Sequence, residues 1–335
     1  MKVKRAGNQT VVFADSPVIL SSYTVVGPME GRGPLGKTFD QVWPDTLNKE
    51  KSWEKAESKM LQEAMQGAVS RSGFGKEQID FLLAGDLLNQ LISANFAARQ
   101  LGLPLIGLYG ACSTMALGLA VAGMLIDGQF ARQVLVGVSS HHDTAERQYR
   151  MPTEHGNQRA ICAQWTVTGA GSVLLGSEGD GPRITAATIG RILDFGEKDT
   201  NNMGAAMAPA VADTILNHLK DLNRQPSDYD LIVSGDLGKV GLRLAKEILL
   251  KSGVAVGEEF SDCGVMIYDA AQDVHAGGSG CGCSSVVFAG DILRKLRAGT
   301  FKRVLFVGSG ALHSPISCFQ GESIPGIGHA VVIEG

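Results

Sequence analysis

The sequence predicts an α/β protein made of two similar halves, with mixed, mainly parallel sheets. Short apolar runs alternate with longer helical segments, which is typical of sheets covered by helices on both faces. An internal repeat is the second observation, because residues 130–137 (FARQVLVG) resemble residues 301–308 (FKRVLFVG), 171 positions later. Cys112 and Cys283 are separated by the same 171 positions. We therefore expect these cysteines to begin corresponding helices.

Composition, charge and cysteine content limit the kinds of protein that this chain can be. The 335 residues are 44% hydrophobic and 19% charged, enough for a large core and two domain-sized units. A net charge of -4 without a long Lys/Arg block gives no reason to expect a nucleic-acid partner. Six irregularly spaced cysteines favour reduced thiols. The start of the chain lacks the apolar core of a signal peptide, and no apolar run approaches about 18 residues, so we expect an intracellular protein without a transmembrane helix.

The first half should contain a helix that begins after Ser52, a good N-cap residue, and carries a stripe of small and apolar side chains spaced four apart. The other elements follow from apolar runs and from Gly/Pro-rich breaks. In order, we predict a strand at 18–26, a loop at 27–45, the helix at 52–72, a strand at 79–84, a helix at 94–101, a strand at 105–108, a helix at 115–127, a strand at 133–138, a polar stretch at 139–159 and a strand at 171–176.

The second half repeats this order. Residues 79–86 resemble residues 229–236 at an offset of only 150 positions, so the connection at 255–282 should be longer than its counterpart. We place the two units at 1–178 and 179–335, with their N-terminal helix ends facing a shared interface, a usual place for a ligand. The predicted elements are strands at 183–191, 231–234, 304–307 and 330–333, and helices at 201–222, 237–251 and 284–297.

Cys112 is the first candidate site residue. It lies in the sequence GACST at 110–114, at the turn between a predicted strand and a helix. Unpaired N–H groups and the helix dipole at such a turn can lower a thiol pKa and create a nucleophile. A small buried thiol that only fills a tight helix start is the alternative. We expect Cys112 to line a pocket more than to react.

His141 and His142 follow the strand after the cysteine helix. Adjacent residues on an extended chain point to opposite faces, so we expect no metal site here and only one histidine in the pocket, where it could donate to a ligand carboxylate. Asp86 ends a strand beside the cysteine turn and is either a ligand contact or a helix cap. Its counterpart Asp236 in the repeat favours the structural role.

Two histidines belong to the second half. His313 follows the glycine-rich segment 308–310 and is a pocket candidate, whereas we expect His275 to hold its own loop. The glycine-rich run at 277–283 lacks the Lys-Ser/Thr of a phosphate loop and a second ligand pair for a metal. We expect its glycines to let the backbone approach Cys112 or a ligand.

A duplicated α/β chain with an Ala-Cys-Ser turn opening a helix resembles the thiolase-like superfamily, especially the β-ketoacyl-ACP synthase III type. The resemblance implies a layered α-β-α-β-α fold, a homodimer, no cofactor, and Cys112 at the acyl-accepting position. The catalytic His of these enzymes falls at 233–236, where Asp236 or its neighbours stand, and their Asn falls at Gly278. Since loss of one such donor typically costs about 10²–10³ in rate, we expect no condensation.

Residues 110–114, 136–143 and 275–283 resemble, within that superfamily, a family of proteins from spore-forming Bacilli. This resemblance implies a non-catalytic protein that binds dipicolinic acid, or its calcium complex, and works with membrane-embedded SpoVA proteins in moving it into the developing spore. It would then be peripheral to the spore inner membrane. We expect the ligand-binding residues to be Cys112, His142, His141, Asp86 and His313, and we expect no metal site. A Cys112-dependent acyltransferase, using His142 or His313 as base, and a purely structural subunit remain the alternatives.

Overall fold

The computed structural model describes residues 4–150 and 159–335. Its main sheet contains two five-strand blocks of the same design, joined where β10 meets β3. The strand order is β6-β5-β7-β9-β3 in the first block and β12-β11-β14-β15-β10 in the second. The first block comprises β3 (Val18–Val26), β5 (Phe81–Gly85), β6 (Leu105–Gly107), β7 (Gln133–Ser140) and β9 (Gly169–Gly176); the second comprises β10 (Arg183–Thr188), β11 (Leu231–Ser234), β12 (Phe260–Asp262), β14 (Arg303–Ala311) and β15 (Gly326–Glu334).

Strand directions repeat as well as strand order. In each block the three strands nearest the junction pair antiparallel, as β3–β9–β7 and β10–β15–β14. The two outer strands continue each block in parallel, as β7–β5–β6 and β14–β11–β12. The predicted mixed α/β fold and the internal duplication are therefore confirmed. The predicted boundary between residues 178 and 179 falls in the link between β9 and β10.

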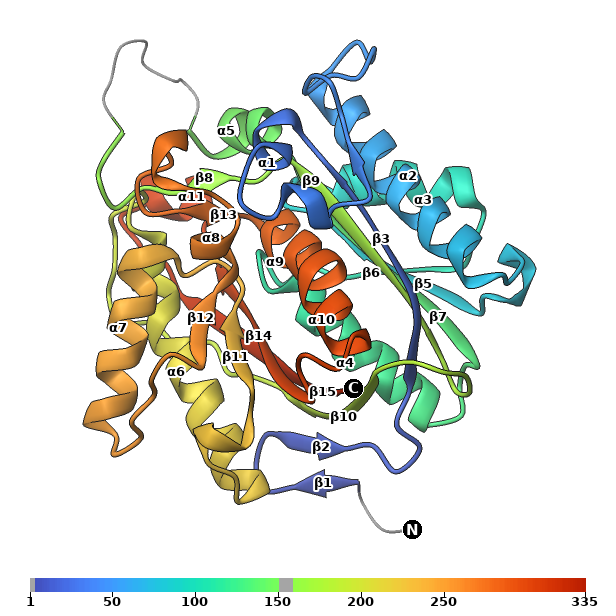
Figure 1. Ribbon diagram of the computed structural model, residues 1–335. Coiled ribbons are helices and arrows are strands. Elements are labelled where there is room, and N and C mark those ends of the chain that lie inside the picture. Colours follow the sequence, from blue (N-terminus) through green and yellow to red (C-terminus); the bar gives the residue numbers. More distant parts are fainter. Residues whose placement is uncertain (1–3, 151–158) are drawn as a thin grey trace.

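Helices form three layers around the two sheet blocks (Figure 1). One outer layer packs on β3, β9 and β7, the other packs on β14 and β15, and the middle layer lies between the blocks. The outer helices are α2 (Trp53–Ser72) with α3 (Ile92–Leu101), and α6 (Met203–Leu222) with α7 (Gly238–Lys251); the middle helices are α4 (Thr114–Asp127), α9 (Cys281–Val287) and α10 (Leu293–Arg297).

Small side chains let the middle layer fit. A Cβ atom added to Gly118 of α4 would lie 2.7 Å from Val136 of β7, and one added to Gly308 of β14 would lie 2.8 Å from the Cβ of Ala116. Every residue of α9, with the sequence CGCSSVV, is buried. Because α4 and α9 pack between the two sheet blocks, their side chains are mostly small and apolar rather than arranged as an apolar stripe opposite a charged face.

Two strands, one helix and one polar stretch differ most from their predictions. β14 and β15 are longer than predicted, because their antiparallel pairing continues through glycine-rich ends that weaken the apolar pattern. The helix predicted at 284–297 is divided by a π-helical turn, Phe288–Ile292. The polar stretch predicted at 139–159 contains α5 (His142–Arg150), whose composition carries no apolar stripe; residues 151–158 lie outside the described part.

Shorter elements connect these layers, and Ser52 caps α2 as predicted, its side chain accepting a hydrogen bond from the Lys55 N–H. In the described part of the chain, no helix has the length and apolarity to cross a membrane. The short elements are β1 (Arg5–Ala6), β2 (Thr10–Val12), α1 (Pro28–Gly31), η1 (Gly36–Thr38), β4 (Gln41–Val42), η2 (Lys76–Gln78), η3 (Asn89–Leu91), β8 (Trp165–Thr166), η4 (Pro226–Asp228), α8 (Cys263–Met266), η5 (Ala270–Gln272), β13 (Gly278–Ser279) and α11 (Pro315–Phe319).

A buried acid joins α2 to β7 and α5. Glu57 is fully buried, and its carboxyl accepts hydrogen bonds from the hydroxyls of Ser139 at 3.2 Å and Thr144 at 2.7 Å. Burial, followed by the negative charge of Asp86, raises the pKa of Glu57 to about 8. The folded protein therefore holds this glutamic acid protonated at neutral pH.

We predict that Glu57→Gln flattens the pH dependence of stability. The pKa of Glu57 is higher in the folded state than its ordinary value of 4.5. Its contribution is therefore fully present below pH 4.5 and is lost as pH rises toward 8, by at most about 1.4 kcal/mol per pH unit. Urea unfolding at pH 5, 6, 7 and 8 measures this slope. The exposed control Glu77→Gln should keep the wild-type slope, and equal slopes for wild type and Glu57→Gln would contradict the prediction.

Candidate functional site

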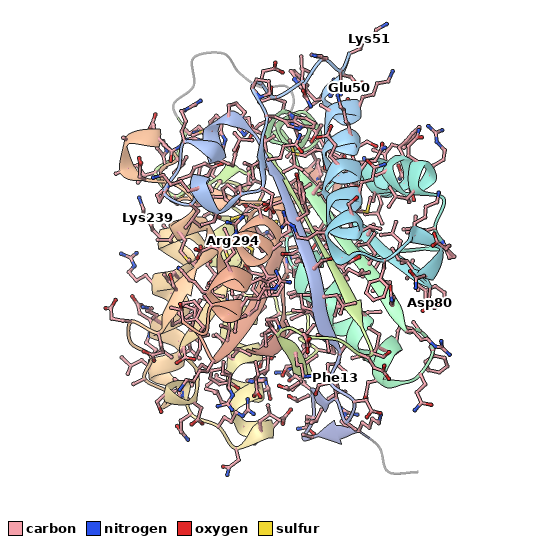
Figure 2. All side chains as sticks on the ribbon, turned by 45° about the vertical axis from the view of Figure 1, so that its right-hand side comes forward. Phe13, Glu50, Lys51, Asp80, Lys239 and Arg294 are labelled. Carbon is pink, nitrogen blue, oxygen red and sulfur yellow. The ribbon has the colours of Figure 1, made fainter. Side chains whose placement is uncertain are left out.

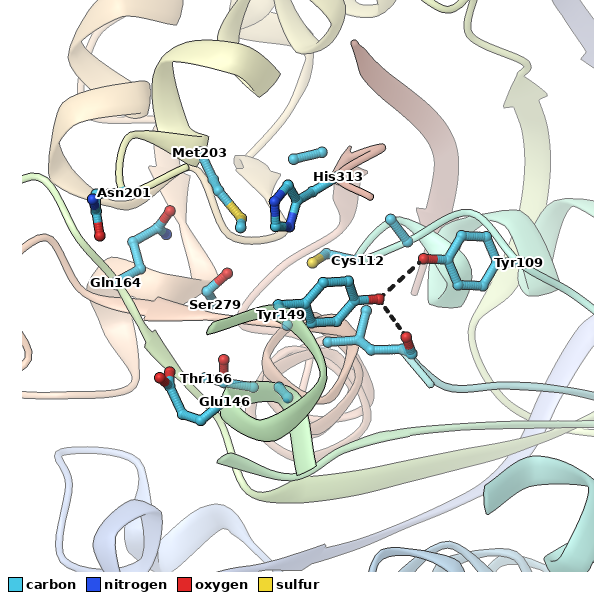
Figure 3. Close-up of a pocket in the computed structure, with 15 residues that line it drawn as sticks. Tyr109, Cys112, Glu146, Tyr149, Gln164, Thr166, Asn201, Met203, Ser279 and His313 are labelled. Carbon is cyan, nitrogen blue, oxygen red and sulfur yellow. Dashed lines mark hydrogen bonds between the residues drawn. The ribbon is translucent and has the colours of Figure 1, made fainter. Parts of the chain in front are cut away.

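A cavity of about 580 Å³, measured with its open mouth, lies where the N-terminal ends of α4 and α9 meet α5 (Figure 3). Only about 40 Å³ of this space can hold the centre of a water molecule, so the cavity is narrow. Both halves of the chain contribute to its wall. The lining residues are Leu87, Tyr109, Ala111, Cys112, Ala145, Glu146, Tyr149, Gln164, Thr166, Asn201, Met203, Ser279, Gly280, Ala311 and His313.

Cys112 lies at the floor of this cavity, in the tight turn before α4. Ala111 adopts a left-handed φ of 49°, which a non-glycine residue rarely does. The turn is fixed by hydrogen bonds from the Ser113 hydroxyl to the Gly110 carbonyl at 2.6 Å and from the Thr114 hydroxyl to the Ala111 carbonyl at 2.6 Å. These contacts hold the thiol, 6% exposed, at the cavity wall as the sequence led us to expect.

Asp236 lies beside the Cys112 thiol, within hydrogen-bonding distance of it. The carboxyl group is fully buried and accepts hydrogen bonds from the hydroxyls of Ser309 at 2.7 Å and Ser279 at 3.0 Å, and from the Gly280 N–H at 3.0 Å. All of these neighbours are donors, so they oppose the effect of burial, which raises the Asp236 pKa. A carboxyl group thus occupies the place beside the cysteine.

The surroundings of the Cys112 thiol make it a weak nucleophile. Burial raises the pKa of Cys112 well above its ordinary value, and the negative charge of Asp236 and the hydrogen bond to it act in the same direction. The Gly280 N–H opposes them and is outweighed. The helix N-terminus alone would have favoured a thiolate, but here the buried carboxylate and the low-dielectric surroundings keep the sulfur protonated.

The repeat partners Asp86 and Asp236 have different roles. Asp86 is fully buried, and its oxygens accept hydrogen bonds from the N–H groups of Leu88 at 2.7 Å and Ala94 at 2.7 Å. It is absent from the residues that line the cavity. Its geometry is that of a cap for the start of α3, the structural alternative considered from the sequence, whereas Asp236 contacts the cavity cysteine.

The histidines that follow β7 do not line the cavity. His141 is fully buried, with Nε2 2.8 Å from the Thr46 carbonyl, and burial lowers its pKa. The ring of His142 stacks on Trp165 with centroids 3.7 Å apart. Because β7 continues to Ser140 and α5 begins at His142, these side chains point toward α2 and Trp165 rather than toward Cys112.

His313 is the histidine that the structure places in the cavity wall. Its ring lies 5.3 Å from that of Tyr149, tilted by 38°. His275, by contrast, holds its own loop, as expected: its Nδ1 lies 2.9 Å from the Ala160 carbonyl and its Nε2 3.3 Å from Asp273. Of the predicted ligand-binding residues, Cys112 and His313 meet at one cavity, and Asp86, His141 and His142 lie behind its wall.

Two tyrosines separate the cavity from a neighbouring hollow at the surface. The hydroxyl groups of Tyr109 and Tyr149 are 3.2 Å apart, and that of Tyr149 also donates to the Leu87 carbonyl, as the dashed lines of Figure 3 show. Both tyrosines and His313 also line the outer hollow, which is bounded by the 88–91 and 312–315 segments. This arrangement gives the cavity an aromatic entrance.

Sequence reasoning missed Gln164 and the two tyrosines. Gln164 is 4% exposed, and its Nε2 donates to the carbonyls of Asp236 at 2.7 Å and Gly278 at 2.9 Å. These two bonds orient the amide, and its Oε1 has no hydrogen-bond partner among the described residues. A buried acceptor in a cavity wall marks a point where a ligand could bind. Only the position of Tyr109, directly before the cysteine turn, could have indicated it.

The charge of the wall limits its chemistry. Glu146 is an acidic residue of the wall, and the lining residues include neither Lys nor Arg. Within residues 4–150 and 159–335, no cluster of three or more His, Cys, Asp or Glu side chains could hold a metal ion. The sequence predicts that Asp236 or its neighbours and Gly278 stand where condensing enzymes carry His and Asn. Gly278 has no side chain, and the oxygens of Asp236 accept hydrogen bonds from Ser279, Gly280 and Ser309.

Solved condensing enzymes have this fold. The 3-oxoacyl-[acyl-carrier-protein] synthase III of Aquifex aeolicus VF5 matches with a TM-score of 0.60 and 15% identity, covering 95% of this chain and 100% of that one. Cerulenin-bound OleA of Xanthomonas campestris matches with a TM-score of 0.65 and 13% identity, covering 96% and 100%. At such identities the likeness establishes the fold alone, and it confirms the predicted thiolase-like architecture.

Sequence comparisons are more specific. The chain is 47% identical over 332 residues to the stage V sporulation protein AD of Bacillus subtilis (strain 168), covering 99% of this chain and 98% of that protein. The family model described as stage V sporulation protein AD (SpoVAD) matches residues 7–334. The chain therefore belongs to the stage V sporulation protein AD family.

Proposed function

We propose that this protein binds dipicolinic acid, as its calcium complex, in the cavity beside Cys112, and that it acts without catalysis in the uptake of this compound into the developing spore. The observation that carries the proposal is a cavity at the junction of the two halves with a protonated cysteine in its wall. Residues of both halves line this cavity, among them Cys112 and His313. The buried Asp236 beside the thiol favours the protonated, weakly nucleophilic form.

The wall supports a planar, neutral ligand. Tyr109, Tyr149 and His313 provide aromatic surface at the entrance, and Gln164 Oε1 provides a buried oxygen. Free dipicolinate carries two negative charges, and bringing them beside Glu146 and the buried Asp236 without a cation would cost desolvation free energy. Calcium cancels these charges in the complex and prefers oxygen ligands. This argument favours the calcium complex over the free dianion.

Isothermal titration calorimetry with matched histidine variants tests the proposal. We predict that the wild-type protein binds calcium dipicolinate more tightly than dipicolinate alone. His313→Asn should weaken binding about fivefold or more, because one polar contact contributes about 1 kcal/mol. The control His275→Asn lies outside the cavity and should bind like wild type; asparagine tolerates its positive φ of 53°. No binding of either form would refute the proposal.

The alternative of a Cys112-dependent acyltransferase makes the opposite prediction about the thiol. We expect iodoacetamide at pH 8 to modify the partly exposed Cys162 and Cys318 at least tenfold faster than Cys112, whose thiol is buried and protonated. Peptide mass spectrometry measures the rates, and in urea all six cysteines should react alike. A thioester that forms at Cys112 with acyl-CoA and turns over would establish the acyltransferase instead.

The proposal extends to partners. We propose a homodimer formed through β6, the edge strand of the first block, and association with the membrane-embedded SpoVA proteins at the spore inner membrane. Support for the dimer comes from the edge itself: Ile106 is 36% exposed, and Tyr109 and Phe96 nearby are 48% and 43% exposed. A free strand edge with apolar neighbours is suited to pairing with a second copy. Membership of the sporulation family supports the SpoVA association.

We predict that Ile106→Arg converts the dimer to a monomer, because it places a charge on the pairing edge. Multi-angle light scattering should give twice the 35.3 kDa of one chain for wild type and the single mass for the variant. Ile192→Arg, at a residue 63% exposed in the other half, is the matched control and should remain dimeric. A monomeric wild type would rule out this interface.

A further inference from the structure

Three arginines from opposite halves of the chain meet at one place on the surface. Arg71 ends α2, and Arg294 and Arg297 belong to α10; between them runs β3 (Figure 2, where Arg294 is labelled). Arg71 and Arg294 are 44% and 49% exposed. None of the three lines the cavity beside Cys112. The cluster is therefore separate from the site described above.

The Asp40 carboxylate binds two of the guanidinium groups. Its Oδ1 accepts hydrogen bonds from Arg71 at 2.9 Å and Arg294 at 3.0 Å, and its Oδ2 accepts the Thr24 N–H at 2.9 Å and the Thr24 hydroxyl at 3.1 Å. The carboxylate is only 7% exposed and has a partner on each oxygen. It fixes the two arginines close together while leaving several of their N–H groups available.

Ser22 brings in the third guanidinium. Arg71 donates to the Ser22 carbonyl at 2.8 Å, and its guanidinium lies 4.9 Å from the ring centre of Tyr23. Arg297 reaches the Ser22 hydroxyl and the Ile19 carbonyl only at 3.5 Å each, the limit of a hydrogen bond. Burial lowers the pKa of Arg297, and the positive charge of Arg71 adds to this effect while Asp40 opposes it. The N–H groups of Arg297 therefore make only long hydrogen bonds within the protein.

The local charge is unbalanced. Three guanidinium groups face one carboxylate in a protein whose net charge is -4. Favourable interaction with helix C-terminal ends accounts for the placement of Arg71 and Arg297 in last turns. It does not account for the meeting of Arg71 and Arg294 on the Asp40 carboxylate, with Arg297 beside them at Ser22. Their planar, forked donors match the oxygens of a phosphate group, which accepts several such bonds.

We propose that Arg71, Arg294 and Arg297 form a binding site for a phosphate group, free or in the headgroup of an anionic lipid. The phosphate oxygens would accept hydrogen bonds from the remaining N–H groups of Arg294 and Arg297. The negative charge of the phosphate would offset the repulsion between Arg297 and Arg71. Because α2 and α10 belong to different halves, the bound group would also link the two halves across β3. This inference does not depend on the function proposed for the cavity.

The experiment compares two double variants that remove the same charge. Arg294→Gln/Arg297→Gln alters the cluster, and Arg243→Gln/Lys246→Gln alters α7. Calorimetry measures inorganic phosphate binding, with chloride holding ionic strength constant, and co-sedimentation measures binding to phosphatidylglycerol vesicles against phosphatidylcholine vesicles. We expect the cluster variant to bind at least tenfold more weakly than wild type in the arm that shows binding, and the α7 variant to bind like wild type.

The two arms identify the source of the phosphate. Binding of inorganic phosphate without vesicle binding assigns a free phosphate, and vesicle binding that phosphate displaces assigns a lipid headgroup. Absence of wild-type binding in both arms, or equal loss in both double variants, would overturn the inference. If the cluster variant does not fold, Arg297→Lys serves instead. It keeps the charge but loses the forked geometry, so about threefold or greater weakening is expected.

Discussion

The structure depends on burying two helices between two sheets. α9 is buried throughout and α4 along most of its surface, so both are rich in small and apolar residues. Glycines such as Gly118 and Gly308 allow close contact between these helices and the strands. The same packing brings the N-terminal ends of both helices to one place. The cavity arises there, because the turn before α4 and the glycine-rich segment before α9 leave space that no side chain fills.

The chemistry beside the cavity depends on one buried carboxyl group. Asp236 is held by donors from Ser279, Gly280 and Ser309, which come from two separate segments of the second half. Their hydrogen bonds make it a fixed part of the wall next to Cys112. In a condensing enzyme this place needs a hydrogen-bond donor for a developing negative charge. The oxygens of Asp236 are already occupied by three donors of the protein itself.

The sequence predicted the architecture well because the duplication is visible in the residues themselves. The offset of 171 residues correctly paired β7 with β14 and the turn at Cys112 with the start of α9. It favoured the structural role that Asp86 has, but it could not distinguish Asp86 from Asp236. The two share a place in the repeat and differ in their partners, which are backbone N–H groups for Asp86 and the hydroxyls of Ser279 and Ser309 with the Gly280 N–H for Asp236. The identity of a side chain's partners depends on contacts between segments far apart in the chain.

The same limit explains the remaining differences in the site. Tyr149 and Gln164 lie in a polar region without periodicity, so nothing in their neighbourhood indicated that they would face Cys112. His142 was a reasonable candidate from its position after a strand, but the helical start of α5 turned its ring onto Trp165. Cys112 and His313 were predictable, since each follows a turn next to the sheet–helix junctions that build such cavities.

The protonated state of Cys112 has a consequence for the durability of the protein. Peroxide and disulfide exchange both act on the thiolate, and burial keeps this thiol in its protonated form. By keeping the proton on sulfur, Asp236 and the low-dielectric wall protect the residue from chemical ageing. A cavity shaped by such a cysteine retains its form under oxidising conditions that would modify a thiolate-based active site.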